Sequence, residues 1–285
     1  MDEAVERAAA VAHALLFTPG RTKLSGLDAR ATPEMSDKDA AAADLLEVDD
    51  RLSQLQERLW AEGVGGGRRR IVLVLQGMDT SGKDGTIRSV AGALNPQGVA
   101  VTSFKAPTAE ELRHDFLWRF DRAVARAGHV GIFNRSQYED VLIVRVHGLV
   151  PESEWSSRYQ RINDFERRHS DDGVVWVKVM LHISPEAQKE RLLARLDDPT
   201  KYWKYNPSDL AERALWSDYA AAYGDLLQRC STDVAPWYVV PSDRKWYRNW
   251  ACAHLVLGAL EQLAPQYPPA DFNVAQQRRL VEAAP

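Results

Sequence analysis

Two glycines and a lysine, spaced as Gly-x-x-x-x-Gly-Lys, follow the apolar run Ile71–Leu75. In this pattern the backbone N–H groups of a loop curl around an anion, and the lysine adds a positive charge. The helix expected from Thr86 points the positive end of its dipole at the same place. This chemistry is typical of phosphate binding, and the residues we expect to bind phosphate are Gly77, Thr80, Ser81, Gly82, Lys83, Asp84, Gly85 and Thr86.

Two acids lie within this phosphate loop. The residue after the lysine is normally Ser or Thr, whose hydroxyl ligates Mg²⁺, but here it is Asp84. Asp79 lies inside the loop itself. Carboxylates suit a phosphate site if they hold metal ions against a highly charged substrate, so we favour a metal or catalytic role for Asp79. Two simpler explanations stay open: Asp84 as an acid that favours a helix N-terminus, and Asp79 as a turn residue.

A second polar cluster follows the apolar strand expected at 130–133, and it contains Asn134, Arg135, Glu139 and Asp140. Sheets in α/β proteins place their ligands at the carboxyl ends of the strands. In a P-loop protein such a strand usually ends in the aspartate that reaches Mg²⁺, whereas here that position is Asn134. Arg135 is well placed to reach a transferring phosphoryl group. The alternative is that Glu139 and Asp140 are surface acids at the start of a helix.

Four cations gather near the end of a helix in a candidate lid, residues 186–215: Arg191, Arg195, Lys201 and Lys204. The two arginines are four residues apart and therefore share a helix face. Charged helix faces are usually just solvated, but a basic lid that excludes water and neutralises charge recurs in phosphoryl-transfer enzymes. We favour the lid and expect its cations to bind phosphate.

Two weaker candidates lie after other strands. Lys105 follows the second expected strand and could face the same cleft. The aromatic-rich stretch 237–248 contains the last strand and the residues just after it, and its rings either pack in the core or stack on a base. The histidines show no metal-ligand or triad spacing, so we expect them to be structural.

The composition limits the classes of partner. The 285 residues carry a net charge of −4, so no global basic field recruits nucleic acid or an anionic membrane. Two cysteines are too few for a disulfide framework. The first residues form neither a convincing signal peptide nor a membrane span, and we expect a cytoplasmic protein.

The phosphate loop needs strands and helices that alternate along the chain. Helices are expected at 3–17 and 40–60, ahead of the loop. Apolar runs predict strands at 71–75, 99–104, 130–133, 174–183 and 237–240. Strands alternating with helices predict an α/β fold with a parallel sheet that helices cover on both faces. We expect an N-terminal helical extension over 1–67, one α/β domain over 68–264 and a C-terminal tail over 265–285.

At these residues the chain resembles the polyphosphate kinase 2 family. The matching segments, in the family's order, are 77–87, 104–107, 131–146, 191–204 and 235–249. The resemblance implies a thymidylate-kinase-like P-loop fold with a helical lid. It also implies Mg²⁺-dependent, reversible phosphoryl transfer between inorganic polyphosphate and a nucleotide. The forms Gly-Lys-Asp-Gly and Asn-Arg-Ser-x-Tyr-Glu-Asp are similar to the subgroup that acts on both nucleoside mono- and diphosphates. Gln137 departs from it, because a histidine is common there.

The resemblance also implies roles for individual residues. Asp79 and Lys83 match the catalytic acid and lysine of the loop, and Arg135 joins them as a catalytic residue. The implied metal ligands are Asp79 and Asp140. The implied nucleotide contacts are Lys105, Asn134, Glu139 and Asp140.

The implied function is a polyphosphate-dependent nucleotide kinase that converts AMP and ADP into ADP and ATP, with GMP and GDP left open as acceptors. By family resemblance a homo-oligomer, a dimer or tetramer, is expected. One alternative is a nucleoside monophosphate kinase with ATP as donor. Another is a P-loop nucleotide-binding protein without turnover. The chain lacks the Asn-Lys-x-Asp motif of guanine-binding switches, which argues against this alternative.

Overall fold

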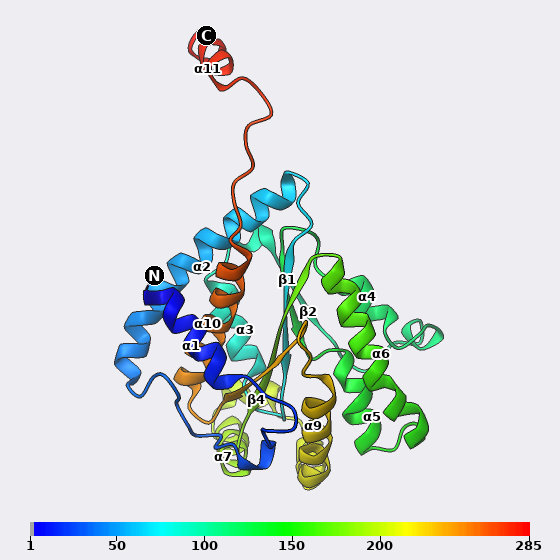
Figure 1. Cartoon of the computed structure of the whole chain (residues 1–285). Helices are drawn as coiled ribbons and strands as arrows, with labels where there is room; N and C mark the ends of the chain where they lie inside the picture. The colour runs from blue at the N-terminus through cyan, green and yellow to red at the C-terminus, as the bar shows by residue number, and fades with distance from the viewer. Residues whose placement is uncertain (1–2) are drawn as a thin grey trace.

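The protein contains a five-stranded, fully parallel sheet with the strand order β2-β3-β1-β4-β5 (Figure 1). The computed structural model describes residues 3–285, so the first two residues of the expected extension 1–67 lie outside it. The strands confirm the predicted ones to within one residue at each end: β1 Arg70–Gln76, β2 Val99–Ser103, β3 Val130–Asn134, β4 Val174–His182 and β5 Trp237–Pro241.

Helices cover both faces of this sheet, as predicted. The central strand β1 is buried along its whole length, and its side chains alternate between two cores. Ile71, Leu73 and Leu75 face a core built with α1 (Glu3–Leu15), α2 (Lys38–Val64), α3 (Lys83–Gly92) and α10 (Lys245–Leu263). Val72 and Val74 face a core built with α4 (Trp118–Ala123), α6 (Glu152–Asp171) and α9 (Trp216–Cys230).

The N-terminal helices belong to the first of these cores. Leu52, Leu55 and Leu59 of α2 are buried, so this face of the helix packs into the core. The expected end of the first helix at residue 17 is wrong. Phe17 lies beside β5, where its backbone N–H donates to the carbonyl of Trp237 at 2.8 Å. The helix ends at Leu15 because the chain then pairs with a strand instead.

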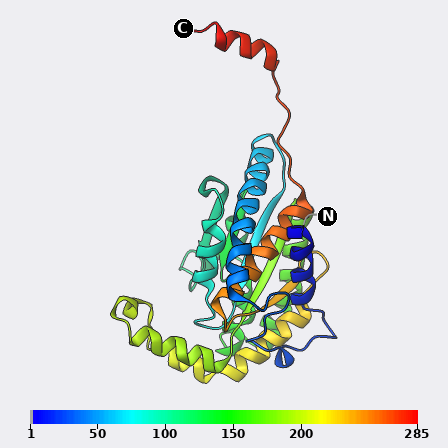
Figure 2. The ribbon, with the colours of Figure 1, turned by 90° about the vertical axis from the view of Figure 1, so that its left-hand side faces the viewer.

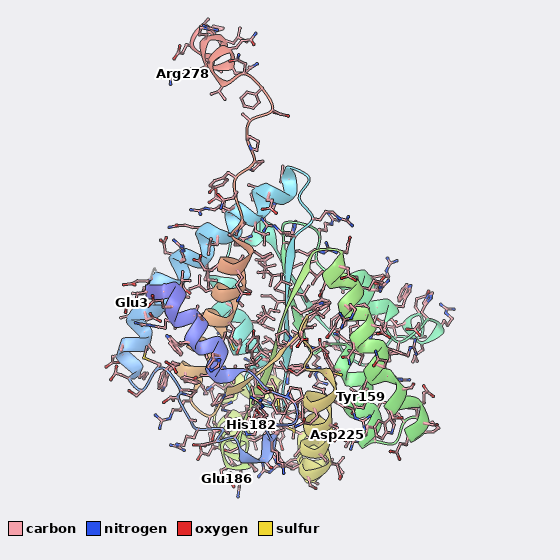
Figure 3. All side chains as sticks on the ribbon, in the orientation of Figure 1. Glu3, Tyr159, His182, Glu186, Asp225 and Arg278 are labelled. Atoms are coloured by element: carbon pink, nitrogen blue, oxygen red, sulfur yellow. The ribbon has the colours of Figure 1, made fainter. Side chains whose placement is uncertain are left out.

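The remaining elements lie at the periphery of the sheet. Among residues 3–285 they include α5 (Ile143–Val146), α7 (Pro185–Leu196), α8 (Asp209–Ala214) and α11 (Val274–Glu282). Figure 2 shows the region of α7 projecting from the body at the edge of the sheet. The α11 helix, which carries Arg278, stands off the body at the end of an extended linker (Figure 3). No helix in the described chain is long and apolar enough to cross a membrane.

Candidate active site

The phosphate loop connects β1 to α3. Gly82 adopts a left-handed conformation (φ 109°), which lets α3 begin at Lys83 rather than at Thr86 as expected. Lys83 Nζ donates to the carbonyl of Gly77 at 2.6 Å, and burial lowers the pKa of this lysine. The buried hydroxyls of Thr80, Ser81 and Thr86 have no hydrogen-bond partner within the described structure.

A cavity of about 700 Å³ opens above this loop. It brings together most of the predicted phosphate-binding residues with Lys105 and Asn134. The cations at its wall come from the loop, from the ends of β2 and β3, from the α7 region and from the start of α10: Lys83, Lys105, Arg135, Arg191, Arg195, Lys201, Lys204, Lys245 and Arg248. Against them stand only two acids, Asp79 and Asp84. We call this space the basic cavity, and its charge suits a polyanion.

A second cavity, of about 210 Å³, lies on the other side of the loop residue Asp79. Apart from Arg135, its charged side chains are acids, and aromatic rings lie beside them: Glu139, Asp209, Glu212, Trp216, Tyr219 and Tyr223. We call it the acidic cavity. Asp79 and Arg135 line both cavities, so the two spaces meet at this pair.

Arg135 is held at this junction by backbone and side-chain contacts. Its φ of 64° is unusual for a residue with a side chain, and such strain is typical of functional positions. Its guanidinium approaches Glu139 at 3.3 Å and Asp79 at 3.5 Å. The carboxylate of Glu139 has the largest effect on Arg135 and raises its pKa. Burial opposes this shift, and the carboxylate of Asp79 adds to it, so the pKa of Arg135 is raised overall. The arginine is therefore a permanent positive charge between the cavities.

Asn134 connects the end of β3 to the phosphate loop. Its Nδ2 donates to Asp84 Oδ1 at 3.1 Å. Both side chains line the basic cavity. Asp84 therefore lies in the first turn of α3 and also contacts the residue that ends the neighbouring strand.

Asp140 lies apart from the other predicted site residues. Its Oδ1 accepts from Arg158 Nη1 at 2.8 Å, and it lines a third cavity with Arg158 and Arg161 instead of the basic or the acidic cavity. Burial raises the pKa of Asp140 to about 6, although Arg158 opposes this shift. Consecutive residues of a helical turn do not face the same side, so Glu139 and Asp140 diverge. The structure does not bring Asp140 together with Asp79 as a pair of ligands.

The cations of the α7 region are partly engaged by the protein itself. Arg191 donates to the carbonyls of Thr80 at 2.7 Å and of Ser81 at 3.1 Å, and also to those of Ser242 and Asp243. Arg191 thus joins the phosphate loop to the loop after β5. Arg195, in the last turn of α7, donates to the carbonyl of Lys204 at 2.9 Å. In the turn beyond α7, Lys201 pairs with Asp198 at 2.7 Å.

Comparison with known proteins agrees with this geometry. The family model described as Polyphosphate kinase 2 (PPK2) matches residues 35–268. The chain belongs to the polyphosphate kinase 2 family. The resemblance predicted from the motifs is thereby confirmed, and the matched range includes α2 as well as the sheet and the α7 region.

Relatives within this family span nearly the whole chain. A Meiothermus ruber protein named AMP/ADP-polyphosphate phosphotransferase is 46% identical over 264 residues, covering 92% of this chain and 97% of that protein. A Rhodopseudomonas palustris protein named ADP-polyphosphate phosphotransferase is 42% identical over 245 residues, covering 82% and 83%. The crystal structure of polyphosphate kinase 2 from Arthrobacter aurescens TC1 superposes with a TM-score of 0.94 at 50% identity, covering 97% and 98%. The P-loop kinase fold is thereby confirmed.

Two cations of the basic cavity were not assigned from the sequence, Lys245 and Arg248. They lie just after β5, at the same carboxyl edge of the sheet as the phosphate loop, so their position after a strand was the available signal. Gln137, by contrast, is buried and donates to Glu166 at 2.9 Å. This departure from the subgroup pattern therefore lies in the packed interior, outside both cavities.

Proposed function

We propose that this polyphosphate kinase 2 transfers phosphoryl groups from inorganic polyphosphate to AMP and ADP, giving ADP and ATP. The observation that carries the proposal is the meeting of a basic and an acidic cavity at Asp79 and Arg135. A donor in one cavity and an acceptor in the other would have their reacting phosphates side by side. The names of the relatives, AMP/ADP- and ADP-polyphosphate phosphotransferase, support this choice of substrates.

The basic cavity suits the polyphosphate chain. Each phosphate unit carries negative charge, and only a wall dense in cations neutralises several of them at once. Transfer between phosphate chains needs no protein nucleophile, because positioning and charge stabilisation supply most of the catalysis. Lys83 and the loop N–H groups hold the phosphate at the transfer point. Arg135 stabilises the charge that spreads over it in the transition state.

The acidic cavity suits the nucleoside. Carboxylates such as Glu139, Asp209 and Glu212 accept hydrogen bonds from ribose hydroxyls and from amino groups of a base. The rings of Trp216 and Tyr219 offer apolar surface for a planar base. Acids at this wall also disfavour a second polyanion, so each substrate has a reason to occupy its own cavity.

The residues at the junction fit a magnesium ion shared with substrate. No three His, Cys, Asp or Glu side chains gather as a metal cage within residues 3–285. Mg²⁺ is typically held by one or two carboxylates together with phosphate oxygens, and Asp79 offers such a carboxylate at the transfer point. When bound, the ion neutralises phosphate charge. We do not extend this role to Asp140, which lines neither the basic nor the acidic cavity and lies 2.8 Å from Arg158.

A donor-by-acceptor matrix tests the function. The purified chain is given Mg²⁺, one donor (polyphosphate or ATP) and one acceptor (AMP, ADP, GMP or GDP), and products are resolved by chromatography. We expect ADP and ATP from the polyphosphate arms. Products only from ATP plus a monophosphate would favour an ordinary nucleoside monophosphate kinase, and binding without product in any arm would favour a non-catalytic protein.

Two variants test the assigned roles. Asp79→Asn and Lys83→Ala each lower kcat by about 100-fold or more, the usual cost of removing a group that stabilises transition-state charge. Matched controls are Asp233→Asn and Lys189→Ala, which change exposed residues outside the cavities. Turnover within a few-fold of the unchanged protein, at an unchanged melting temperature, would refute the role of that residue.

We also propose that the chain forms a homo-oligomer, a dimer or tetramer. Large apolar side chains are exposed on α2, among them Leu46 and Val64. Such side chains suit contacts between copies. Light scattering coupled to size-exclusion chromatography measures the mass, and a monomer at micromolar concentration would contradict this.

A further inference from the structure

Arg248 is a nearly buried cation at the wall of the basic cavity. It lies in the first turn of α10, is 4% exposed and lines the cavity beside the phosphate loop. It belongs to the stretch 237–248, for which the sequence suggested only aromatic packing or stacking. The phosphoryl transfer proposed for Asp79, Lys83 and Arg135 does not use it.

No carboxylate compensates the charge of Arg248 within residues 3–285. Its guanidinium donates only to neutral oxygens: Ser81 O at 3.3 Å, and Asn249 Oδ1 at 3.2 Å from Nε and 2.8 Å from Nη2. Burial lowers the pKa of Arg248 to about 10, so the group is still charged at neutral pH. A buried charge without a counter-charge is costly, and a bound anion would relieve that cost.

Two N–H donors of the Arg248 guanidinium remain beyond these contacts. A guanidinium has five N–H donors, and these three contacts leave one on each terminal nitrogen. Paired donors of this kind match two oxygens of a phosphate chain. The contact to Ser81 also fixes the guanidinium against the loop that holds the transferring phosphate.

Gly85 leaves the space that the guanidinium occupies. A Cβ at this position would lie 2.7 Å from Arg248 Nη2, closer than real Cβ atoms come to their neighbours. The backbone of Gly85 is helical, with no positive φ that would require glycine. In a helix alanine is favoured over glycine by about 1 kcal/mol. Local propensity therefore favours a side chain at residue 85, and the approach of Arg248 opposes one.

We propose that Arg248 binds the polyphosphate chain next to the phosphate loop, and that Gly85 is glycine because it admits this arginine. The assignment rests on the proposal that polyphosphate occupies the basic cavity. Arg248 contacts substrate in ground state and transition state alike, so its loss acts mainly on the KM for polyphosphate.

The test compares Arg248→Met, Arg248→Lys and Gly85→Ala with the unchanged protein. Hydrogen bonds to charged groups predict that Arg248→Met raises the KM for polyphosphate by about 10-fold or more, with the KM for AMP within about twofold. Arg248→Lys keeps the charge but loses the paired donors of the guanidinium, and gives an intermediate KM for polyphosphate. Gly85→Ala displaces the guanidinium and raises the same KM. The double variant is no worse than Arg248→Met, because both changes remove one interaction.

Two controls separate this contact from general effects. Arg88→Met removes an exposed cation of α3 that lines neither the basic nor the acidic cavity. Gly92→Ala places a Cβ on the same helix in open space. Both leave the KM for polyphosphate unchanged. Melting temperatures show whether each variant is folded. If Arg248→Met does not fold, Arg248→Lys replaces it in the test.

Three results would overturn the proposal. One is an unchanged KM for polyphosphate in folded Arg248→Met or, failing that, Arg248→Lys. Another is full additivity of Gly85→Ala and Arg248→Met, since their effects would then be independent. A rise in the KM for AMP alone would place the nucleotide in this cavity. None of these touches the reaction itself, which the activity of the unchanged protein with polyphosphate tests separately.

Discussion

Removal of Lys178 should destabilise the protein through one identifiable charge. Lys178 of β4 and Glu166 of α6 are both fully buried, and Nζ lies 2.6 Å from Oε2. The other carboxylate oxygen accepts from Tyr138 at 2.7 Å and from Gln137 at 2.9 Å. Lys178 also donates to Tyr138 Oη and to Cys230 O, each at 2.7 Å. The pair therefore ties the turn after β3 to the centre of the domain.

The variant Lys178→Met leaves the Glu166 carboxylate buried without its counter-charge. Breaking a buried pair in this way costs about 3–5 kcal/mol. For a chain of this size each kcal/mol lowers the melting temperature by roughly 2–4 °C, so we expect a fall of roughly 6–20 °C. Gln137 and Tyr138 contact this pair and follow Arg135 in the same turn, so a change at the pair also disturbs Arg135. We therefore expect activity to fall by more than the unfolded fraction of the variant explains.

The pH dependence identifies the charge responsible. Burial raises the pKa of Glu166 above its usual value of 4.5, and Lys178 opposes this shift. Without the lysine, the pKa of the folded state rises further above that of the unfolded chain. The folded variant then holds a proton that the unfolded chain releases, so its stability falls as pH rises above about 4.5. The stability deficit of the variant relative to the unchanged protein should be larger at pH 8 than at pH 5.

Urea unfolding and thermal melting at both pH values measure these differences. The matched control is the double variant Lys178→Met/Glu166→Gln, which removes both charges and keeps an amide in place of the carboxylate. It should be more stable than Lys178→Met at pH 8. A loss below about 1 kcal/mol in the single variant, or a double variant that is no more stable, would refute the electrostatic reasoning.

Three further predictions concern other parts of the molecule. Arg191→Met removes the link between the phosphate loop and the loop after β5, so kcat should fall about tenfold or more, the cost of lost hydrogen bonds to a charged group, while Arg88→Met has no effect on kcat. The pKa of Asp140, raised to about 6 from the ordinary 3.8, means that stability falls as pH rises from about 4 to 6; melting temperatures of Asp140→Asn should lack that contribution, and an identical pH profile would contradict it. The side chains of 274–285 are all exposed, so deletion of this segment should cost below about 1 kcal/mol and shift the melting temperature of the remaining chain by less than about 2 °C. A larger fall would show that the tail makes a stabilising contact.

Much of the fold followed from local patterns. The runs of Ile, Leu and Val predicted all strands because a parallel sheet covered on both faces buries every residue of a central strand such as β1. Helix ends were harder to predict. The first helix ends at Leu15 because the next residues meet β5, more than two hundred positions away in the sequence, and no local signal reports that contact.

The candidate site divides in the same way. Parallel strands bring their carboxyl ends to one edge, so Lys83, Lys105 and Arg135 could be grouped from their positions after strands. Asp140 could not be separated from Glu139 on this basis, because a one-residue step around a helical turn decides which cavity a side chain faces. Arg248 was missed because its significance lies in the absence of an acid partner, which is a property of its surroundings.

By itself, the sequence determined the α/β class, the phosphate loop, the family and the collection of cations near the loop. These depend on residue types at fixed spacing, which short-range geometry translates directly into strands, turns and helix faces. Only the tertiary structure decided that the cations form one cavity, that an acidic cavity meets it at Asp79 and Arg135, and that Gly85 makes room for Arg248. Those features arise where segments distant in the chain pack together, and their distances, burial and unpaired charges exist only after folding.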